Sequence, residues 1–453
     1  MKFRKMVAAI MTVSMAATMM PTVALAEEIA EVVTEVTNEV AETAVAKVGE
    51  TTYETLEEAI AAAEEDATVT LLKSTEGPGV VIDKDITIDF GGKTYTFTTP
   101  AVGSTGTTTN GFQILEGNDV TLMDGALEVA DANKGEYYIL IQNYADLTVT
   151  DMKLDGENLD RWSLTDGDSY VLSNNCGTVS IEDTTIVAND DGDLAFAFDA
   201  CKFSSYDAPV VTVDDGCKVY GGIEVSPEAT LVIEGGSFTD LANAVKYAKD
   251  NATIKLLESV EGPGIVIDKD ITIDFNKKTY DIVGPAVGSA GTTTLGFQIL
   301  KNNDVTLENG TITESTDGAL EQPKAVKMLV QNYSNLTLVD MVLDGSELGG
   351  SGRYVLSNNS GNITITKNTE IIADTANFAF DVCKYASYVE PVVTFDANFT
   401  GGVKGAFEVS EGLESNLVIH AGHFTQNPAN YVVTGKAAVA STKAGYNYMV
   451  GDK

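Results

Sequence analysis

The sequence contains one long segment twice. Residues 76–90 return almost unchanged as residues 261–275, and both copies carry the string VIDKDITIDF, at 81–90 and at 266–275. Further matches follow in the same order and at a nearly constant offset, since 111–115 (GFQIL) returns at 296–300. The chain must therefore fold into a unit that can be repeated along one axis, and a repeat architecture is the first expectation.

A finer repeat lies inside each copy. Short alternating segments begin at Ile86, Val120, Leu147 and Val179, at similar intervals along the chain, and residues 230–233 close the series. The alternation points Ile, Val and Leu inward while Thr and Asp face water. Two-residue hairpin turns do not join these segments, so the pattern favours stacked coils over a meander. We predict an all-β fold, a right-handed parallel β-helix (β-solenoid).

Each copy begins with a short helical pattern. Leu56, Ala59, Ile60 and Ala63 form an apolar stripe within residues 56–66, and Thr55 with Glu58 forms a capping box. A similar stripe follows residue 240, which suggests that each module starts with a helix that covers the open end of its core. The predicted units, packed end to end, are module 1 at 47–239, module 2 at 240–427 and a C-terminal tail or cap at 428–453.

Residues 1–26 have the pattern of a secretory signal peptide. Three basic residues precede an apolar run that ends in the cleavage pattern Ala-Leu-Ala at 24–26. Residues 27–46 are acidic and simple, as in a flexible leader. We expect a secreted, extracellular chain without membrane insertion or a covalent surface anchor. Cleavage removes the three basic residues and takes the formal charge from −39 to −42, which excludes nucleic acid as a partner.

Several strings resemble a known family. Residues 48–60 (VGETTYETLEEAI), 68–72 (TVTLL), 86–93 (ITIDFGGK) and 422–431 (GHFTQNPANY) resemble pectin-lyase-like right-handed parallel β-helix modules of exported proteins of gut Firmicutes. The resemblance implies the fold and export. It also brings two enzyme classes into consideration, the polysaccharide lyases and the glycosidases, although one fold carries many functions.

A lyase of this kind would use an arginine or lysine base beside Ca²⁺. Arg161 and Arg353 are the candidates, because each is the only arginine of its module and both lie in the matching loop. The alternative for both is pairing with the acidic surface. The cluster of Asp190, Asp191 and Asp193 is the candidate Ca²⁺ site, with a solvated turn as the alternative; no other cofactor is expected.

A glycosidase would need two or three carboxylates on adjacent coils. Asp124, Asp151 and Asp183 follow equivalent strands and are the candidates for such a row. The second copy has Asn309, Asp340 and Lys367 in their places. An amide and an ammonium cannot do the same acid–base chemistry, so turn positions are the favoured interpretation.

Other polar and aromatic residues do recur in both copies. They are either turn residues that bond to the backbone or parts of a groove for a neutral polysaccharide, in which tyrosine rings stack on sugars. The candidate binding residues are Gln142, Asn143, Tyr144, Tyr170 and Tyr206 in the first copy and Gln331, Asn332, Tyr333, Tyr354 and Tyr388 in the second. Gln113/Gln298, Asn174/Asn358, Asp199/Asp381 and Lys202/Lys384 recur too.

The leading functional prediction is a non-catalytic β-solenoid that binds a neutral glycan, or a host or cell-wall surface protein. A polysaccharide lyase or glycosidase is the alternative. The sequence leaves open the ligand, the oligomeric state and the disulfide state of four cysteines. We favour buried thiols over a bridge for Cys176, Cys201, Cys217 and Cys383, because only Cys201 and Cys383 match between the copies.

Overall fold

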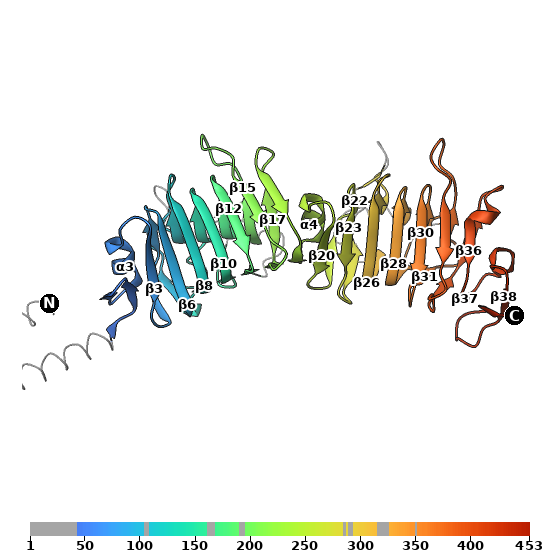
Figure 1. Ribbon diagram of the computed structural model, residues 1–453, viewed down its shortest axis with the longest axis horizontal. Coiled ribbons are helices and arrows are strands. Elements are labelled where there is room, and N and C mark those ends of the chain that lie inside the picture. The colour runs from blue at the N-terminus through green and yellow to red at the C-terminus, as the bar shows by residue number, and fades with distance from the viewer. Residues whose placement is uncertain are drawn as a thin grey trace, which may run out of the picture.

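The computed structural model describes residues 43–103, 108–160, 168–189, 195–283, 287–288, 293–314, 326–348 and 351–453. Over these residues the chain is mostly β-strand, and its strands form one 27-stranded sheet and two six-stranded sheets. Figure 1 shows an elongated molecule with helix α3 near one end and α4 near the middle. The predicted signal peptide and nearly all of the leader lie outside the described residues.

The long sheet runs through both copies of the sequence repeat. In the first copy its strands are β1 (Ala46–Val48), β2 (Thr51–Tyr53), β3 (Ala67–Leu71), β4 (Thr75–Pro78), β6 (Ile86–Thr99), β8 (Asp119–Val129), β10 (Asp146–Asp155), β12 (Thr178–Glu182), β13 (Thr185–Val187), β15 (Val210–Val213), β16 (Lys218–Tyr220), β18 (Thr230–Ile233) and β19 (Gly236–Phe238). In the second copy they are β20 (Ala252–Leu256), β21 (Val260–Gly262), β23 (Ile271–Asp274), β24 (Thr279–Ile282), β26 (Asp304–Glu314), β28 (Asn335–Gly345), β30 (Asn362–Thr366), β31 (Glu370–Ala373), β33 (Val392–Phe395), β34 (Gly402–Lys404), β36 (Leu417–Ile419) and β37 (Gly422–Phe424). The C-terminal segment 428–453 adds β38 (Lys436–Ala440) and β39 (Tyr448–Asp452).

Each copy also has a parallel six-stranded sheet of its own. The first contains β5 (Val80–Ile82), β7 (Asn110–Ile114), β9 (Ile139–Asn143), β11 (Ser169–Asn174), β14 (Ala195–Ala200) and β17 (Gly222–Val225). The second contains β22 (Ile265–Ile267), β25 (Leu295–Ile299), β27 (Met328–Asn332), β29 (Tyr354–Asn358), β32 (Phe378–Val382) and β35 (Ala406–Val409). Short 3-10 helices complete the described fold: η1 (Asp131–Asn133), η3 (Glu414–Asn416) and η4 (Ala429–Tyr431).

The finer repeat of the sequence sets the strand register. Val120 pairs in parallel with Ile86 on one side and with Leu147 on the other, and Leu147 pairs with Val179. All four side chains are buried, so equivalent apolar residues stack from strand to strand. The expected parallel, stacked strands are confirmed. The sequence reading omitted strand β15, which pairs with both β12 and β18.

Both expected helices are present. Helix α3 (Leu56–Ala62) begins at Thr55, whose hydroxyl accepts a hydrogen bond from the Glu58 N–H, as the capping pattern predicts. It ends earlier than residue 66, because Ala63 has an extended backbone (φ −64°, ψ 138°). Helix α4 (Leu241–Tyr247) begins at Asp240, whose carboxylate caps the Asn243 N–H.

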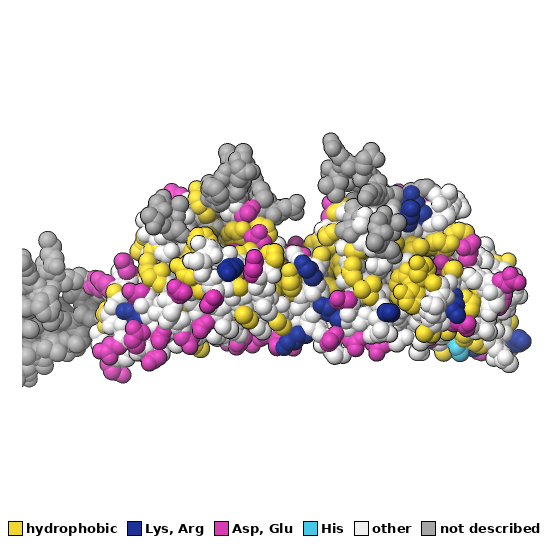
Figure 2. All heavy atoms as spheres, turned by 90° about the horizontal axis from the view of Figure 1, so that it is seen from above, with side chains coloured by type: hydrophobic (Ala, Val, Ile, Leu, Met, Phe, Trp, Pro, Cys, Tyr) yellow, Lys and Arg dark blue, Asp and Glu magenta, His cyan; other side chains and the backbone are white. Residues whose placement is uncertain are grey.

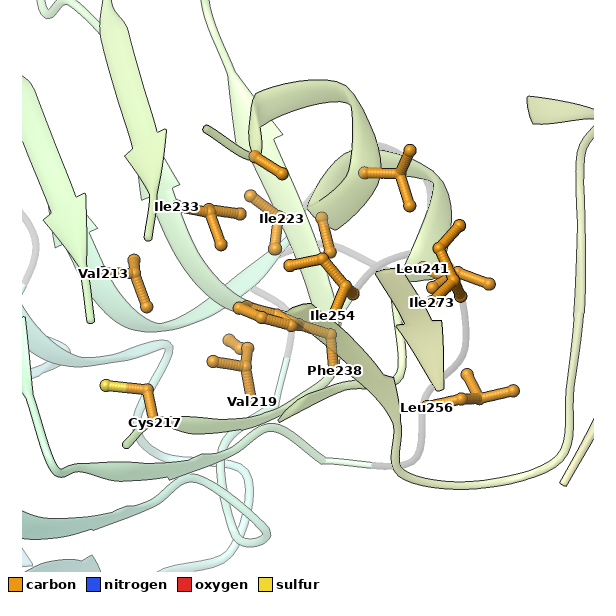
Figure 3. Packing of buried hydrophobic residues seen from close by; sticks show 14 of the residues in the cluster. Val213, Cys217, Val219, Ile223, Ile233, Phe238, Leu241, Ile254, Leu256 and Ile273 are labelled. Atoms are coloured by element: carbon orange, nitrogen blue, oxygen red, sulfur yellow. The ribbon is translucent and has the colours of Figure 1, made fainter. Parts of the chain in front are cut away.

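The two copies share one ladder and one hydrophobic core. The long sheet continues through the junction, where Gly236 of β19 pairs with Ile254 of β20. The six-stranded sheets do not pair with each other in the described chain, and α4 buries Leu241 and Val245 at this interruption. Figure 3 shows Leu241 in the same packed group as Phe238.

The described ends of the chain depart from the parallel pattern. Strand β1 pairs antiparallel with β2 and β3, and β39 pairs antiparallel with β37 and β38. These pairings protect the last strands of the ladder from joining another chain. No helix in the described residues has the length and apolar character needed to cross a membrane.

The packing at the junction gives a first prediction. Phe238 is fully buried and lies in the ladder between Val219 and Leu256. Phe238→Ala should cost about 3–5 kcal/mol, because it leaves a cavity in the shared core. The shift of the urea unfolding midpoint measures this cost.

Val389→Ala is the control, because Val389 is 74% exposed. It should change stability by less than about 0.5 kcal/mol. A Phe238→Ala variant that unfolds at the wild-type midpoint would contradict a core that is continuous through the junction.

Candidate functional site

The predicted carboxylate row exists, but its residues lie at bends of the backbone, within β8, within β10 and between β12 and β13. Asp124, Asp151 and Asp183 have φ angles of 54°, 53° and 45° and are exposed. Asn309, Asp340 and Lys367 repeat this with φ angles of 60°, 52° and 51°. A left-handed backbone favours Asp and Asn, which accounts for the four aspartates and Asn309 without catalysis. The nearby Asp214 carboxylate raises the pKa of Asp183, with smaller contributions from desolvation and from Asp151.

The arginine and calcium candidates are only partly described. Arg161 and the cluster of Asp190, Asp191 and Asp193 lie outside the described residues. Arg353 is described, and its guanidinium donates to the Val326 carbonyl oxygen at 3.2 Å. Its positive charge also opposes the rise in the pKa of Glu314 that burial causes. Arg353 therefore serves the local structure of its loop.

The recurring amides lie within the fold. Gln142 is buried and accepts hydrogen bonds from the side-chain amides of Asn110 and Gln113, each at 2.9 Å. Asn143 is fully buried, and its side chain both donates to the Ala145 carbonyl and accepts from the Ala145 N–H. Such bonds satisfy the backbone where a strand turns, so this first copy supports the structural interpretation.

The amides of the second copy are held in the same way. Gln331 accepts from the Gln298 amide at 3.0 Å, and the fully buried Asn332 bonds to both backbone groups of Ser334. The Asn332 amide also donates to the Asn358 side chain at 2.9 Å. Gln331 and Asn332 therefore hold the turn together, and their side chains have few hydrogen-bonding groups left for a ligand.

Tyr170 and Tyr354 form matching contacts in the two copies. The Tyr170 ring stacks on Phe196, and its hydroxyl donates to a Glu224 carboxylate oxygen at 2.7 Å. Tyr354 stacks on Phe378 and donates to Glu408 at 2.8 Å. Desolvation and the hydrogen bond to Glu224 raise the pKa of Tyr170. Both tyrosines orient a glutamate side chain.

The remaining tyrosine candidates come together in two groups of rings. The first aromatic cluster is Tyr144, Phe203 and Tyr206, in which the ring centroid of Tyr144 lies 6.0 Å from Phe203 and 5.1 Å from Tyr206. The second aromatic cluster is Tyr333, Tyr385 and Tyr388, with centroid distances of 5.9 Å and 5.5 Å from Tyr333. Sequence reasoning omitted Phe203 and Tyr385, which occupy equivalent positions with different rings.

A pocket lies beside each aromatic cluster. All three rings of the second cluster line a cavity of about 400 Å³ together with Gln298 and Lys301. Tyr144 of the first cluster lines a cavity of about 320 Å³ with Cys176 and five carboxylate residues. Burial, with smaller effects from Tyr385 and Tyr388, raises the pKa of Tyr333 to about 12. Its hydroxyl is protonated at neutral pH, as that of an ordinary tyrosine is, and can donate a hydrogen bond.

One ring of each cluster is exposed to solvent, on a chain with a formal net charge of −39. Phe203 is 48% exposed and Tyr385 is 51% exposed. Figure 2 shows hydrophobic side chains gathered over both halves of the molecule, with acidic side chains spread among them. Exposed rings beside a pocket are typical of ligand-binding surfaces.

A third group was not expected from the sequence. Asp199, Cys201 and Glu224 hold their ligand atoms within 4.8 Å of one another, which is close enough to bind one divalent cation after deprotonation. Asp199 accepts hydrogen bonds from the Asn174 N–H and the Ser173 hydroxyl. Desolvation raises the pKa of Asp199 well above its ordinary value and that of Cys201 to about 12.

The same residue types occur in the second copy as Asp381, Cys383 and Glu408. Strand pairing places Glu224 opposite Asp199 and Glu408 opposite Asp381. Desolvation raises the pKa of Asp381 to about 7. The sequence signal for this group was the recurrence of Glu-Val at 224–225 and at 408–409. Which residue each glutamate faces could not be predicted, because its pairing with Asp199 or Asp381 depends on the length of the coil between the two strands.

All four cysteines are free thiols in the structure. Cys176 and Cys217 are buried, as expected for structural thiols, and the Cys217 Sγ contacts the Ile181 carbonyl oxygen. Cys201 is half-buried and Cys383 is exposed, so the interpretation of all four as buried residues is wrong at these two positions. The reason is their place in the chain, because Cys201 directly follows β14 and Cys383 directly follows β32, where the backbone leaves the sheet.

No family model matches the chain, and no curated protein matches its sequence. The resemblance to pectin-lyase-like modules therefore stays a prediction, and function has to be inferred from the geometry of the chain itself.

The backbone at Asp151 gives a second prediction. Because φ is 53° there, Asp151→Val should cost about 1–2 kcal/mol, whereas Asp151→Asn should be close to neutral. Urea unfolding of both variants measures the difference. Equal stabilities of the two variants would contradict a conformational role for this aspartate.

The buried Asp381 carboxyl gives a third prediction, on pH. Its pKa is raised from 3.8 to about 7 in the folded chain, so the folded state binds more protons between these values. The contribution of Asp381 to the free energy of unfolding therefore falls as the pH rises from about 4 to about 7. Asp381→Asn cannot ionise and should gain stability relative to wild type across this range.

The measurement is the urea midpoint of both proteins at pH 4 and pH 8. The exposed Asp83→Asn serves as the control for loss of one surface charge. A difference between Asp381→Asn and wild type that is the same at both pH values would contradict a proton bound at this site.

Proposed function

We propose that the chain is an exported, non-catalytic β-solenoid that binds glycan through its two aromatic clusters. The observation that carries this proposal is the recurrence of three packed rings at the same place in both copies, next to a pocket in each. A hydrophobic core needs no such rings at the surface. Retention of exposed rings in two copies favours a role in recognition.

The chemistry of the second cluster suits a neutral sugar. Tyrosine faces stack on the apolar faces of sugar rings, while phenol and amide groups bond to hydroxyls. Tyr333, Tyr385 and Tyr388 supply the faces, and the pocket adds the Gln298 side chain. Two clusters on one chain would also let a single polymer be held at two points, which strengthens binding without new contacts.

The finer architecture is part of the same proposal. We infer that the three sheets close into a right-handed parallel β-helix of two tandem modules, each started by a capping helix. The in-register parallel ladders and the positions of α3 and α4 support this inference. Export through the signal-peptide pattern of residues 1–26, and membership of the pectin-lyase-like modules, belong to the proposal as well.

A polysaccharide lyase or glycosidase is the alternative. The arrangement nearest to a glycosidase is the carboxylate pair of Asp199 and Glu224 on neighbouring strands. Asp199 is only 4% exposed, and its carboxylate already accepts bonds from Ser173 and Asn174. A sugar cannot reach such a group without opening the coil, so this pair favours a structural role.

Binding to immobilised neutral polysaccharides tests the proposal. The wild-type chain should be retained, and the double variant Tyr385→Ala/Tyr388→Ala should bind at least about tenfold more weakly, a change of about 1.4 kcal/mol. Tyr220→Ala, a partly exposed tyrosine on β16, is the matched control and should bind like wild type.

Two outcomes would overturn the proposal. Sustained release of shortened products would favour the lyase or glycosidase. Equal binding of the double variant and the control would show that the second aromatic cluster does not contact the glycan.

A further inference from the structure

The pocket beside the second aromatic cluster contains a hydrogen-bond acceptor that the described chain leaves unused. Gln298 lines this cavity and is only 6% exposed. Its side-chain nitrogen donates to the Gln331 oxygen at 3.0 Å, but its Oε1 accepts no hydrogen bond from any described residue. A buried acceptor without a partner is unfavourable, so this oxygen points to a ligand that donates to it.

The neighbours of Gln298 fix the direction of its amide. Gln331 donates its own side-chain nitrogen to the Met328 sulfur at 3.3 Å, so it turns its oxygen toward Gln298. Gln298 must then present its nitrogen to Gln331, and its oxygen points away from that residue. The strand neighbour on the other side is Val266, whose side chain cannot donate a hydrogen bond. The Gln298 oxygen is therefore available to a ligand in the cavity.

One positive charge lies at the same cavity. Lys301 lines it, and the Lys301 ammonium lies 5.7 Å from the centroid of the Tyr388 ring. This ammonium forms no ion pair with any described carboxylate, although acidic residues outnumber basic ones by 67 to 28 in the chain. It is thus left able to donate a hydrogen bond to a ligand.

Three tyrosine rings form the aromatic part of the cavity wall. Tyr333, Tyr385 and Tyr388 all line it, and Tyr385 is 51% exposed. The volume of about 400 Å³ lies within the range of about 300–1,000 Å³ that is typical of small-molecule sites. The cavity therefore combines a buried acceptor, a cationic donor and aromatic faces.

An acetamido group carries the complement of all three features. Its N–H donates, its carbonyl oxygen accepts, and its methyl group can pack on an aromatic ring. A secondary amide is planar and trans, so its N–H and its carbonyl oxygen point in opposite directions and can reach two different partners.

Other substituents of a sugar ring fit the cavity less well. A carboxylate cannot donate a hydrogen bond to Gln298. An ammonium group is repelled by the Lys301 ammonium. A hydroxyl group can donate to Gln298, but it brings no methyl group to the tyrosine rings.

We propose that the second pocket binds an N-acetylated amino sugar through its acetamido group. The acetamido N–H donates to the Gln298 Oε1, the carbonyl oxygen accepts from the Lys301 ammonium, and the methyl group packs against the rings of the second aromatic cluster. The proposal rests on the proposed glycan-binding function and names the class of sugar that one of the two clusters takes.

The first copy does not repeat this combination in its described residues. Glu116 stands at the position of Lys301, so a negative charge replaces the positive one. Gln113 is the counterpart of Gln298, but it does not line the described pocket beside Tyr144. The acetamido site is therefore specific to the second copy, and Gln113 offers a matched control.

Saturation-transfer NMR of the full chain at pH 7 tests the preference among sugars. The probes are N-acetylglucosamine, glucose, glucosamine and glucuronate. N-acetylglucosamine should bind at least about tenfold more tightly than each of the others, and its methyl protons should receive the strongest saturation. An affinity for any of the other probes that equals or exceeds that for N-acetylglucosamine would overturn the proposal.

A pair of glutamine variants tests the acceptor. Gln298→Leu should weaken N-acetylglucosamine binding at least about tenfold, because the acetamido N–H loses its partner. Gln113→Leu should bind like wild type. Both variants lose the same kind of bond, since Gln113 donates to Gln142 at 2.9 Å as Gln298 donates to Gln331. Equal binding by the two variants would overturn the proposal.

A lysine variant tests the donor at an exposed position, where the fold should persist. Lys301→Met should weaken N-acetylglucosamine binding about tenfold and should strengthen glucosamine binding, because the repelling charge is removed. Lys218→Met, at an exposed lysine on β16 of the first copy, is the control and should change neither affinity. Unchanged N-acetylglucosamine affinity in Lys301→Met would contradict the proposed contact and overturn the proposal.

The polysaccharide retention experiment separates this proposal from the function on which it rests. Polysaccharide retained through Tyr385 and Tyr388, without a preference for N-acetylglucosamine among the free sugars, would refute the acetamido site alone. N-acetylglucosamine bound through Gln298, without retention of any polysaccharide, would refute only the proposed binding of polymers.

Discussion

The structure depends on the in-register stacking of equivalent apolar residues from strand to strand. Ile86, Val120, Leu147 and Val179 occupy successive positions of one ladder and are all buried. A shift by a single position would turn each of these side chains to the opposite face of the sheet. The register thus fixes which residues become the core, and it leaves the loops between strands free to differ in length and chemistry.

This division explains how a duplicated chain can hold two different pockets. The ladder continues through the junction between the copies, so both halves keep the same core and the same turn asparagines. The loops carry Phe203 and Asp207 in one copy and Tyr385 and Val389 in the other. Ring packing is retained while the charge beside the rings changes.

Much of the fold could be predicted from the sequence because its determinants are local. The alternation of apolar and polar residues that begins at Ile86 predicts which face of the strand is buried. Thr55 and Glu58 together predict where α3 begins. Strand β15 was missed because Val210 follows a proline and lacks the Asp or Thr that opens the other segments. Helix α3 ends early because the backbone of Ala63 is extended, and no residue type in this segment predicts that conformation.

The candidate site could be predicted only in part, because its contacts join residues that are far apart in the sequence. Tyr144 and Tyr206 could be predicted because the same residue types recur in the second copy. Phe203 could not, and only the packing of the rings shows that it lies beside them. Asp199 meets Glu224 through strand pairing, which depends on the length of the intervening coil. Recurrence in both copies could not distinguish the buried Asn143 from the aromatic rings at the surface. A residue type can recur because a turn requires it, as for Asn143, or because the surface requires it, as for the rings.

The central claim is that the chain holds a glycan without cutting it. The most direct measurement is mass spectrometry of a defined oligosaccharide after prolonged incubation with the full chain, with and without Ca²⁺, followed by release from the protein. The account predicts that the oligosaccharide is retained and is recovered at its original mass under both conditions. Recovery of shortened fragments that accumulate with time would contradict it.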